Sequence, residues 1–295
     1  MLPTFLICGA AKSGTTSLWK YVSSHPEVGV APLKEPNFFS KVIHDGYQNN
    51  SRNSRISGQY WRGIYWYENL FRHCSSAKAV GEASVQYMTD VDAPKLISEV
   101  LPHVRLIFLL RDPIDRLISQ YWQEVRDKQP LPSVEEMITN KHPALQRYID
   151  ISSYHIHLER FLRIFPRDQI LVYLLDDLKN NPEYLIQNIY LNIGVNDNYL
   201  PSNLGVRYHK SYKVKWLWLQ QFGSWLNWQW MSKNKKPWPN AVVKAGEMFM
   251  NLNRYPTSSP YLKIDNYQYL YRKLQPAIVY VEKYLSRSLP NWHSY

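Results

Sequence analysis

Cysteine and metal-binding patterns are scarce in this chain. Two cysteines, Cys8 and Cys74, occur among 295 residues, too few for a disulfide framework or a cysteine-based metal set. The nine histidines include no H-E-x-x-H sequence. His155 and His157 are two residues apart, so they point to different sides of a helix. We therefore predict no metal site.

Long apolar runs and long basic runs are also missing. The N-terminus has no basic segment followed by an apolar stretch, and the first predicted core strand begins by Thr4. We therefore expect no signal peptide and no transmembrane segment, and a soluble, cytoplasmic protein. The net charge is +11, but no run of five or more Lys or Arg occurs, which disfavours nucleic acid as a partner.

The chain contains neither an internal repeat nor a low-complexity linker. Aromatic residues are abundant, with 11 Trp and 23 Tyr, and the composition is that of a globular protein. A length of 295 residues is near the upper end for one hydrophobic core. We predict one domain over residues 1–295 and leave the oligomeric state open.

The most informative stretch is residues 4–20. Residues 5–8 form a short continuous apolar run, which predicts a strand buried on both faces. A loop of small residues around Lys12 follows, and Thr15 to Ser17 open a helix. In a strand–loop–helix unit of this kind, loop N–H groups and the helix N-terminus bind an anion. The stretch therefore predicts a phosphate-binding loop.

This loop differs from that of nucleoside triphosphatases. Gly9 and Gly14 have the G-x-x-x-x-G spacing, but Thr15 occupies the position of the lysine that follows the second glycine. The loop's own lysine, Lys12, precedes Gly14 by two residues. The loop can bind phosphate, yet it lacks the lysine that would reach a γ-phosphate.

A second strand–turn–helix unit covers residues 105–126. Residues 106–110 predict a buried strand, which Arg111 ends. Asp112 can cap a helix and Pro113 suits its first turn. The apolar positions that follow, from Ile114 to Val125, have full helical spacing. Arg111 is thus predicted at the carboxyl end of a strand, where ligands bind in open α/β sheets.

The remaining pattern completes an α/β domain with a central, mainly parallel sheet flanked by helices. A turn and a short strand are predicted within residues 25–30, further strands over 79–84 and 170–175, and helices over 93–101, 154–165, 182–193, 266–274 and 276–285. We expect Pro276 to break the last two helices apart. Residues 127–150 are predicted to be polar and irregular, apart from a short helix near 134–138.

Two segments are predicted to lie near the site. In residues 33–39, Pro36 should push Glu35 into an extended conformation, and Phe38 and Phe39 should anchor the segment in the core. Residues 40–75 are predicted to form a loop and a helix over the site. Residues 205–255 are rich in Trp; they contain helical spacing at 219–230, which favours a helix packed on the core, with an acceptor-covering lid or a membrane-facing surface as alternatives.

The phosphate loop and the arginine motif carry a family resemblance. Residues 12–18 resemble the 5′-phosphosulfate loop of sulfotransferases that use 3′-phosphoadenosine 5′-phosphosulfate (PAPS). Residues 111–119 match the 3′-phosphate motif of that family, R-D-P-x-x-R-x-x-S. Residues 35–39, 153–160 and 284–292 are similar to the E-x-x-F-F, S-x-Y-x-x-x-L-E-R and L-G-R-x-L-x-x-W segments of heparan sulfate 3-O- and N-sulfotransferases.

The resemblance implies a fold, a donor and residue roles. It implies a phosphate-loop fold like that of nucleotide kinases, PAPS as donor, 3′,5′-adenosine diphosphate as product, no metal, and a glycan as acceptor. The missing anchor and the altered Trp-rich segment instead suggest a small metabolite as acceptor. By position, Lys12 would stabilise the leaving oxygen and Glu35 would be the general base. Donor-binding residues would be Lys12, Ser13, Gly14, Thr15, Thr16, Ser17, Arg111, Ser119 and Arg254, and acceptor-binding residues Glu82 and Tyr154.

Several alternatives stay open at this point. Relatives often carry a lysine where this chain has Ala83, so Glu82 is either a second acid at the acceptor site or a structural partner of Lys12 or Arg111. His25 and His44 are alternative bases. A nucleotide-dependent kinase would use Asp176 for magnesium. A basic, Trp-rich protein that binds polyanions or membranes is the non-enzymatic alternative.

Overall fold

The computed structural model describes residues 1–40, 58–126, 131–206, 212–214, 246, 254–256 and 262–294. His44, the predicted helix over 219–230 and most of the Trp-rich segment lie outside these residues. Within the described part, no helix has both the length and the apolar character that a membrane crossing requires.

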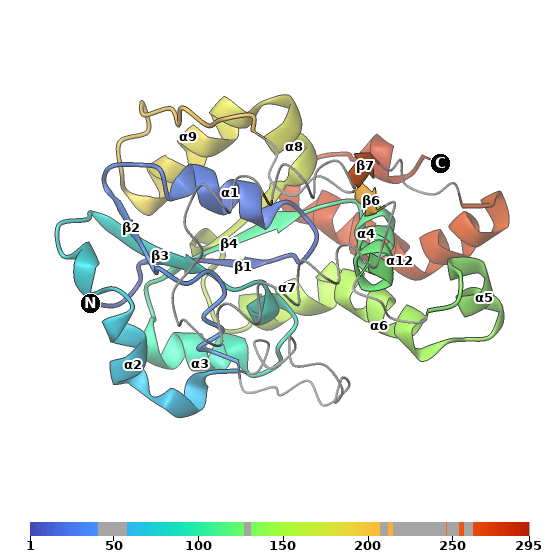
Figure 1. Cartoon of the computed structure of the whole chain (residues 1–295), viewed down its shortest axis with the longest axis horizontal. Coiled ribbons are helices and arrows are strands. Elements are labelled where there is room, and N and C mark those ends of the chain that lie inside the picture. Colours follow the sequence, from blue (N-terminus) through green and yellow to red (C-terminus); the bar gives the residue numbers. More distant parts are fainter. Residues whose placement is uncertain are drawn as a thin grey trace.

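Strands and helices alternate along most of the chain (Figure 1). The strands are β1 Phe5–Gly9, β2 Val28–Val30, β3 Ala79–Ala83, β4 Arg105–Leu110, β5 Ile170–Leu174, β6 Tyr212–Val214 and β7 Arg254–Pro256. The α-helices are α1 Thr15–Val22, α2 Ile64–Asn69, α3 Ala93–Val100, α4 Pro113–Arg126, α5 Val134–Thr139, α6 Pro143–Ser152, α7 Tyr154–Leu162, α8 Leu175–Asn180, α9 Pro182–Ile193 and α12 Ile264–Leu285. Short 3₁₀ helices include η2 Tyr60–Arg62, η4 Val85–Met88 and η6 Pro290–Trp292.

The central sheet has five parallel strands in the order β2-β3-β1-β4-β5. Strand β1 lies in the middle, with β3 on one side and β4 on the other. The chain therefore leaves β1 toward β2 and β3 and returns on its opposite side at β4. Ligands bind in such sheets at the carboxyl ends of the strands where this reversal occurs. The predicted α/β class and the predicted parallel sheet are confirmed.

Both faces of the sheet are covered, which explains the continuous apolar runs in its strands. Phe5 and Ile7 point to one face, where they pack in a core with residues of α1 and α9. Leu6 and Cys8 point to the other, toward residues of α3, α7 and the C-terminal half of α12. Figure 1 shows α1, α8 and α9 on one side of the sheet and α3 and α7 on the other.

A third apolar cluster lies beyond the sheet, among helices α4, α5, α6 and the N-terminal half of α12. The predicted stripe of α4 supplies Ile114, Leu117, Ile118 and Tyr121 to it. Helix α4 follows the carboxyl end of β4 and packs on α5, α6 and α12 in this cluster, so it lies beside the carboxyl ends of the strands.

The predicted helix break at Pro276 is wrong. Helix α12 runs without interruption from Ile264 to Leu285 with Pro276 inside it. An interior proline costs about 3 kcal/mol. Here Leu270 and Leu274 are buried in the third cluster before the proline, and Ala277 and Ile278 are buried in a sheet core after it. Burial on both sides keeps the two halves in one helix.

The prediction of irregular structure over residues 127–150 is wrong for its last part. Helix α6 begins at Pro143 and buries Leu145, Tyr148 and Ile149 at helical spacing. His142 caps it, since its ring Nδ1 accepts the Ala144 N–H at 3.2 Å. A histidine cap is weak in the usual preferences, so the helix start carried little signal.

The extended conformation predicted for Glu35 is also wrong. Its φ is 62°, in the left-handed region, and Asn37 has φ 50°. The Glu35 N–H donates to Ala83 O at 2.9 Å, and this bond to the end of β3 fixes the turn against the local preference of the residue before proline.

Candidate active site

Three neighbouring strands end at one edge of the sheet, and each end carries predicted site residues. Glu82 lies near the end of β3, Lys12 follows β1, and Arg111 follows β4. The strands are parallel, so their carboxyl ends meet. Ala10 N–H donates to Leu109 O at 2.8 Å, which ties the start of the phosphate loop to the end of β4.

The phosphate loop presents an open helix N-terminus. Gly14 is the N-cap of α1 with φ 88°, and no side chain caps this end. Lys12 has φ 68°, so both Lys12 and Gly14 adopt the left-handed backbone conformation. Ser13 is fully buried. Within the described residues, its Oγ makes no hydrogen bond with good distance and angles, and the Tyr154 hydroxyl lies near it. N–H groups without a side-chain cap and a buried hydroxyl beside them suit an anion.

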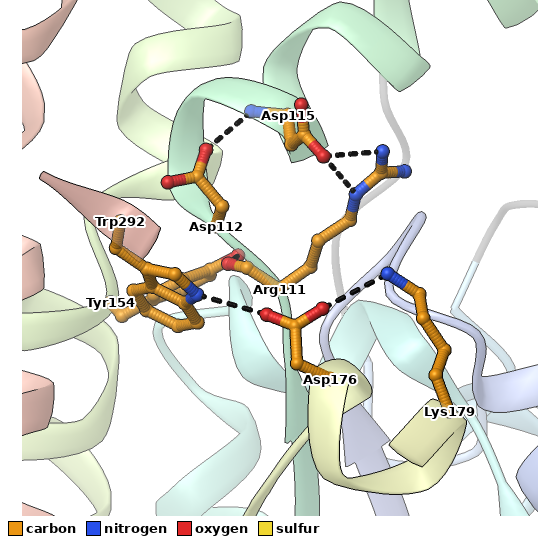
Figure 2. A network of polar contacts seen from close by, with 7 residues as sticks. All are labelled: Arg111, Asp112, Asp115, Tyr154, Asp176, Lys179 and Trp292. Atoms are coloured by element: carbon orange, nitrogen blue, oxygen red, sulfur yellow. Dashed lines mark hydrogen bonds and ion pairs between the residues drawn. The ribbon is translucent and has the colours of Figure 1, made fainter. Parts of the chain in front are cut away.

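Arg111 is oriented by partners on both sides. Its Nη2 and Nε donate to Asp115 Oδ2 at 2.8 and 3.3 Å, and its side chain is 19% exposed (Figure 2). Its carbonyl oxygen accepts the hydroxyl of Tyr154 at 2.8 Å. Asp112 caps α4, since its Oδ1 accepts the Asp115 N–H at 2.7 Å. Burial raises the pKa of Asp112 to about 7.

One face of α4 connects the two predicted anion-binding residues. Asp115, Ser119 and Gln123 follow one another at four-residue steps, so they share a face of the helix. Arg111 pairs with Asp115 at one end of this face. Lys12 Nζ donates to Gln123 Oε1 at 2.5 Å at the other. Eight residues of helix span about 12 Å, and Ser119 lies midway along α4 between Asp115 and Gln123.

Buried polar contacts hold α4 in place. Arg116 is fully buried; its Nε donates to Ser152 Oγ at 2.6 Å and its Nη2 to Tyr148 O at 3.0 Å. Burial lowers the pKa of Arg116 to about 10. Glu124 accepts bonds from Arg147 and the Tyr148 hydroxyl at 2.6 and 2.8 Å. These bonds join α4 to α6, so the face that carries Ser119 is fixed.

Asp176, at the start of α8, is bonded to side chains from two elements (Figure 2). Trp292 Nε1 donates to Asp176 Oδ2 at 3.2 Å, and Lys179 Nζ donates to Asp176 Oδ1 at 2.9 Å. Burial would raise the pKa of Asp176, but the bonds from Lys179 and Trp292 lower it below its usual value. The residue that a kinase would use for magnesium is therefore bonded to a cation and an indole.

Glu35 lies on a segment that we call the acid strap, residues 34–40, at the end of β3. Its carboxyl group is partly exposed, and Lys34 Nζ donates to Glu35 Oε1 at 2.6 Å. Phe38 and Phe39 are buried, as predicted, and Phe38 stacks on Tyr67 with ring centroids 4.3 Å apart. The strap thus leaves the acid accessible while its aromatic residues anchor it.

Glu82 lies beneath the acid strap and is fully buried. Its Oε1 accepts the hydroxyls of Tyr87 and Tyr67 at 2.6 and 3.2 Å, and its Oε2 accepts that of Ser84 at 2.7 Å. Burial raises the pKa of Glu82 to about 7, although these hydroxyls lower it in part. The partners of Glu82 in the described structure are therefore hydroxyls, and neither Lys12 nor Arg111 is among them.

The remaining predicted residues are Tyr154, His25 and Arg254, which come from three different parts of the chain. Tyr154 is fully buried and holds the backbone of Arg111, so its acceptor-binding role stays a prediction. His25, an alternative base, precedes β2 at the amino edge of the sheet, where its Nε2 bonds with Asn196 O at 2.9 Å. Arg254 begins β7, which pairs with β6, and its side chain lies outside the described atoms.

Several residues of the site had no predicted role. Gln123, the partner of Lys12, follows Ser119 by four residues, so helical spacing could have drawn attention to it. Asp115 lies inside the arginine motif but was given no function. Tyr67 reaches Glu82 from α2, and no sequence signal links two residues so placed. Among the described residues, no group of three or more His, Cys, Asp or Glu is placed to hold a metal ion.

Comparison with known proteins relates this chain to sulfotransferases. The sulfotransferase domain model matches residues 2–215. Mouse bifunctional heparan sulfate N-deacetylase/N-sulfotransferase 4 is 29% identical over 210 residues, which cover 67% of this chain and 23% of that protein. Mouse heparan sulfate glucosamine 3-O-sulfotransferase 3B1 is 30% identical over 186 residues, or 61% of this chain and 43% of that protein.

The chain therefore spans less than half the length of these curated relatives. A crystal structure of a sulfotransferase from Alicyclobacillus acidocaldarius has the same fold over 100% of both chains, with a TM-score of 0.69 and 24% identity. The family model covers the phosphate loop, the acid strap, Glu82 and the arginine motif together. This chain belongs to the sulfotransferase family.

Proposed function

We propose that this protein transfers a sulfuryl group from PAPS to a hydroxyl or amine of a small metabolite or carbohydrate. The observation that carries the proposal is the α4 face, which brings Lys12, Ser119 and Arg111 together at the carboxyl ends of adjacent strands. A nucleotide with phosphates at both its 5′ and 3′ ends has anionic groups for the two ends of that face.

The residues present fit this donor. The uncapped N-terminus of α1 and the buried Ser13 hydroxyl offer donors to a 5′-phosphate, together with Thr15, Thr16 and Ser17 at the start of the helix. Arg111 and Ser119 offer a guanidinium and a hydroxyl to a 3′-phosphate. When bound, PAPS supplies an activated sulfuryl group whose leaving oxygen belongs to the 5′-phosphate.

Each catalytic residue has a defined task. Lys12 neutralises the charge that develops on the leaving oxygen, since its ammonium group extends from the loop that binds the 5′-phosphate. Glu35 accepts the proton that the attacking hydroxyl or amine loses, because its carboxyl group is partly exposed at the end of β3. Rigid positioning by the sheet and α4 supplies the remaining rate enhancement.

Lys12 and Arg111 both have replaceable partners. Lys12 bonds with the neutral amide of Gln123, and Arg111 with an exposed carboxylate, Asp115. Exposed ion pairs contribute only about 0–1 kcal/mol. A phosphate dianion can therefore displace Asp115 from Arg111 at small cost.

Two acceptor classes fit the proposed reaction. The relatives named for heparan sulfate suggest a carbohydrate. The replacement of the family lysine by Ala83, which is fully buried, removes a cation from the acceptor side and leaves a less anionic metabolite as an equal candidate.

Transfer of labelled sulfate from PAPS to a panel of carbohydrate and small-molecule acceptors tests the proposal. We expect transfer by the unaltered protein and a loss on the order of 10²- to 10³-fold in Lys12→Ala, the size expected when a stabilising donor is removed from a transition state. Lys95→Ala is the matched control, because Lys95 is an exposed lysine on α3.

Two outcomes would contradict the proposal. The first is tight binding of ATP-Mg without affinity for 3′,5′-adenosine diphosphate, which would favour a kinase. The second is binding to heparin or acidic vesicles that survives Lys12→Ala, with no sulfate transfer to any acceptor, which would favour a polyanion- or membrane-binding protein.

A further inference from the structure

The acid strap is bonded to the end of β3 through every second backbone amide. Residues 35, 37 and 39 each donate a backbone N–H to this region. The three bonds run from Glu35 to Ala83 O at 2.9 Å, from Asn37 to Ser84 Oγ at 3.0 Å, and from Phe39 to the Tyr87 hydroxyl at 3.3 Å. Two of the three acceptors are therefore side-chain hydroxyls, whose orientation is not fixed by the backbone.

Those two hydroxyls are oriented by Glu82. The Ser84 hydroxyl donates to Glu82 Oε2 at 2.7 Å, and the Tyr87 hydroxyl donates to Oε1 at 2.6 Å. A hydroxyl has one proton, and here that proton points to the carboxylate. The oxygen lone pairs are thereby left to accept the strap amides. We call each such chain of two hydrogen bonds, from a strap N–H to a hydroxyl and from that hydroxyl to Glu82, a relay.

Only the ionised carboxylate satisfies all its donors. Glu82 accepts three hydroxyl protons, counting that of Tyr67 at 3.2 Å. A carboxylate has two accepting oxygens, whereas an amide or a protonated carboxyl group offers one and adds a donor of its own. Loss of the charge therefore forces at least one of the three hydroxyls to turn.

Besides the Ser84 hydroxyl, four ionisable groups face Glu82, each from a different segment. They are Cys8 on β1, Glu35 on the strap, Tyr67 on α2 and Tyr87 on η4. The carboxylate of Glu35 repels that of Glu82 and, together with burial, favours the protonated form. The three hydroxyl donors lower the pKa of Glu82 and so oppose burial and the Glu35 charge. The charge of Glu82 therefore depends on the hydrogen bonds that these hydroxyls make to it.

We propose that ionised Glu82 is a positioning residue, which holds the acid strap through Ser84 and Tyr87 and thereby sets the place of the Glu35 carboxyl group against the acceptor. The proposal rests on the function proposed for Glu35. It gives Glu82 no contact with donor or acceptor. It also explains why a fully buried carboxyl group is kept beneath an accessible one.

Glu82→Gln is the first test, since it keeps shape and removes charge. We expect kcat to fall on the order of 10- to 100-fold, as for a misplaced catalytic group, with the KM for PAPS and the affinity for 3′,5′-adenosine diphosphate unchanged. In the unaltered protein kcat should rise with pH through a step near 7, where Glu82 ionises. That step should be missing in Glu82→Gln, a result that a merely structural residue would not produce.

Amide hydrogen exchange gives a readout that needs no acceptor. After correction for intrinsic rates, peptides covering residues 34–40 should exchange more slowly at pH 8 than at pH 6 in the unaltered protein. In Glu82→Gln the two pH values should give equal protection. Ser84→Ala and Tyr87→Phe cut the two relays one at a time while Glu82 remains, so they carry the test if Glu82→Gln does not fold.

Tyr67→Phe is the matched comparison. It removes a buried donor to Glu82 that leads to no strap amide, so strap exchange should change less than in Tyr87→Phe. An unaltered pH profile and unaltered strap exchange in Glu82→Gln, with 3′,5′-adenosine diphosphate still bound, would overturn the proposal. Failure of the unaltered protein to bind that nucleotide would instead overturn the proposed function, and the exchange results would still decide the role of Glu82 in holding the strap.

Discussion

The two ends of the candidate site are built differently. At the proposed nucleotide end, Lys12 and Arg111 bond with Gln123 and Asp115 on one face of α4. At the proposed acceptor end, the strap that carries Glu35 is bonded through buried hydroxyls to Glu82. The first arrangement has partners that a ligand can displace, and the second has partners that no ligand reaches.

This difference follows the chemistry expected at each end. A nucleotide brings its own phosphates, so the cations that bind it need only be kept nearby and oriented until it arrives. A general base must lie within hydrogen-bonding reach of the proton that it accepts, and a displacement of about 1 Å can lower the rate on the order of 10²-fold. We therefore expect buried, rigid hydrogen bonds to position Glu35, whereas Arg111 does not need them.

The largest effect is expected at the acceptor end. Glu35→Gln should lower sulfate transfer on the order of 10²- to 10⁴-fold, the usual contribution of a general base, because the amide cannot accept the proton. Affinity for 3′,5′-adenosine diphosphate should remain, as measured by calorimetry. Glu99→Gln on α3 is the control for loss of an exposed carboxylate. Equal losses of transfer and of nucleotide affinity would place Glu35 at the nucleotide end instead.

A middle-sized effect concerns stability and pH. The folded pKa of Glu82, about 7, lies above the ordinary glutamate value of 4.5, so the folded state binds this proton more tightly than the unfolded state. Glu82 therefore adds most to the free energy of unfolding below pH 4.5, and this contribution is lost as the pH rises from 4.5 to about 7. Glu82→Gln lacks this titration, and its stability relative to the unaltered protein should increase across that range.

Urea unfolding at several pH values measures this difference. Asp112, whose pKa is also raised to about 7, and His157, whose pKa is lowered to about 4, titrate in both proteins, so they cancel in the comparison. A constant difference between the two proteins from pH 4.5 to 7 would contradict the raised pKa of Glu82.

The smallest effect is expected at the nucleotide end. Asp115→Asn removes the carboxylate that competes with a 3′-phosphate for Arg111, so affinity for 3′,5′-adenosine diphosphate should rise a few-fold, the equivalent of an exposed ion pair. The variant should lose about 0.5 kcal/mol of stability, because Asp115 is the acidic residue in the first turn of α4. A fall in nucleotide affinity would mean that Asp115 orients Arg111 for binding.

Local patterns in the sequence predicted the sheet but not the contacts that organise the site. Residues 5–8 and 106–110 are continuous apolar runs because both faces of β1 and β4 are covered, so their burial could be read directly. Asp112 and Pro113 marked the start of α4, as the capping bond of Asp112 confirms.

The errors arose where distant packing outweighs local preference. The apolar residues on both sides of Pro276 are buried in different clusters, which no local rule describes. Glu35 adopts a positive φ because its N–H bonds with Ala83, far away in the sequence. Tyr67 reaches Glu82 from a separate helix. The residue types in the site could be predicted, whereas the pairing between them required the fold.

The proposed function requires that Lys12 and Arg111 bind the two phosphate ends of one nucleotide. Calorimetry with 3′,5′-adenosine diphosphate and 5′-AMP, on the unaltered protein and on Arg111→Ala, tests it most directly. We predict that Arg111→Ala weakens binding of the doubly phosphorylated nucleotide by about 2–3 kcal/mol, as for charge-assisted hydrogen bonds, and leaves 5′-AMP binding unchanged. Equal weakening of both nucleotides, or of neither, would contradict the claim.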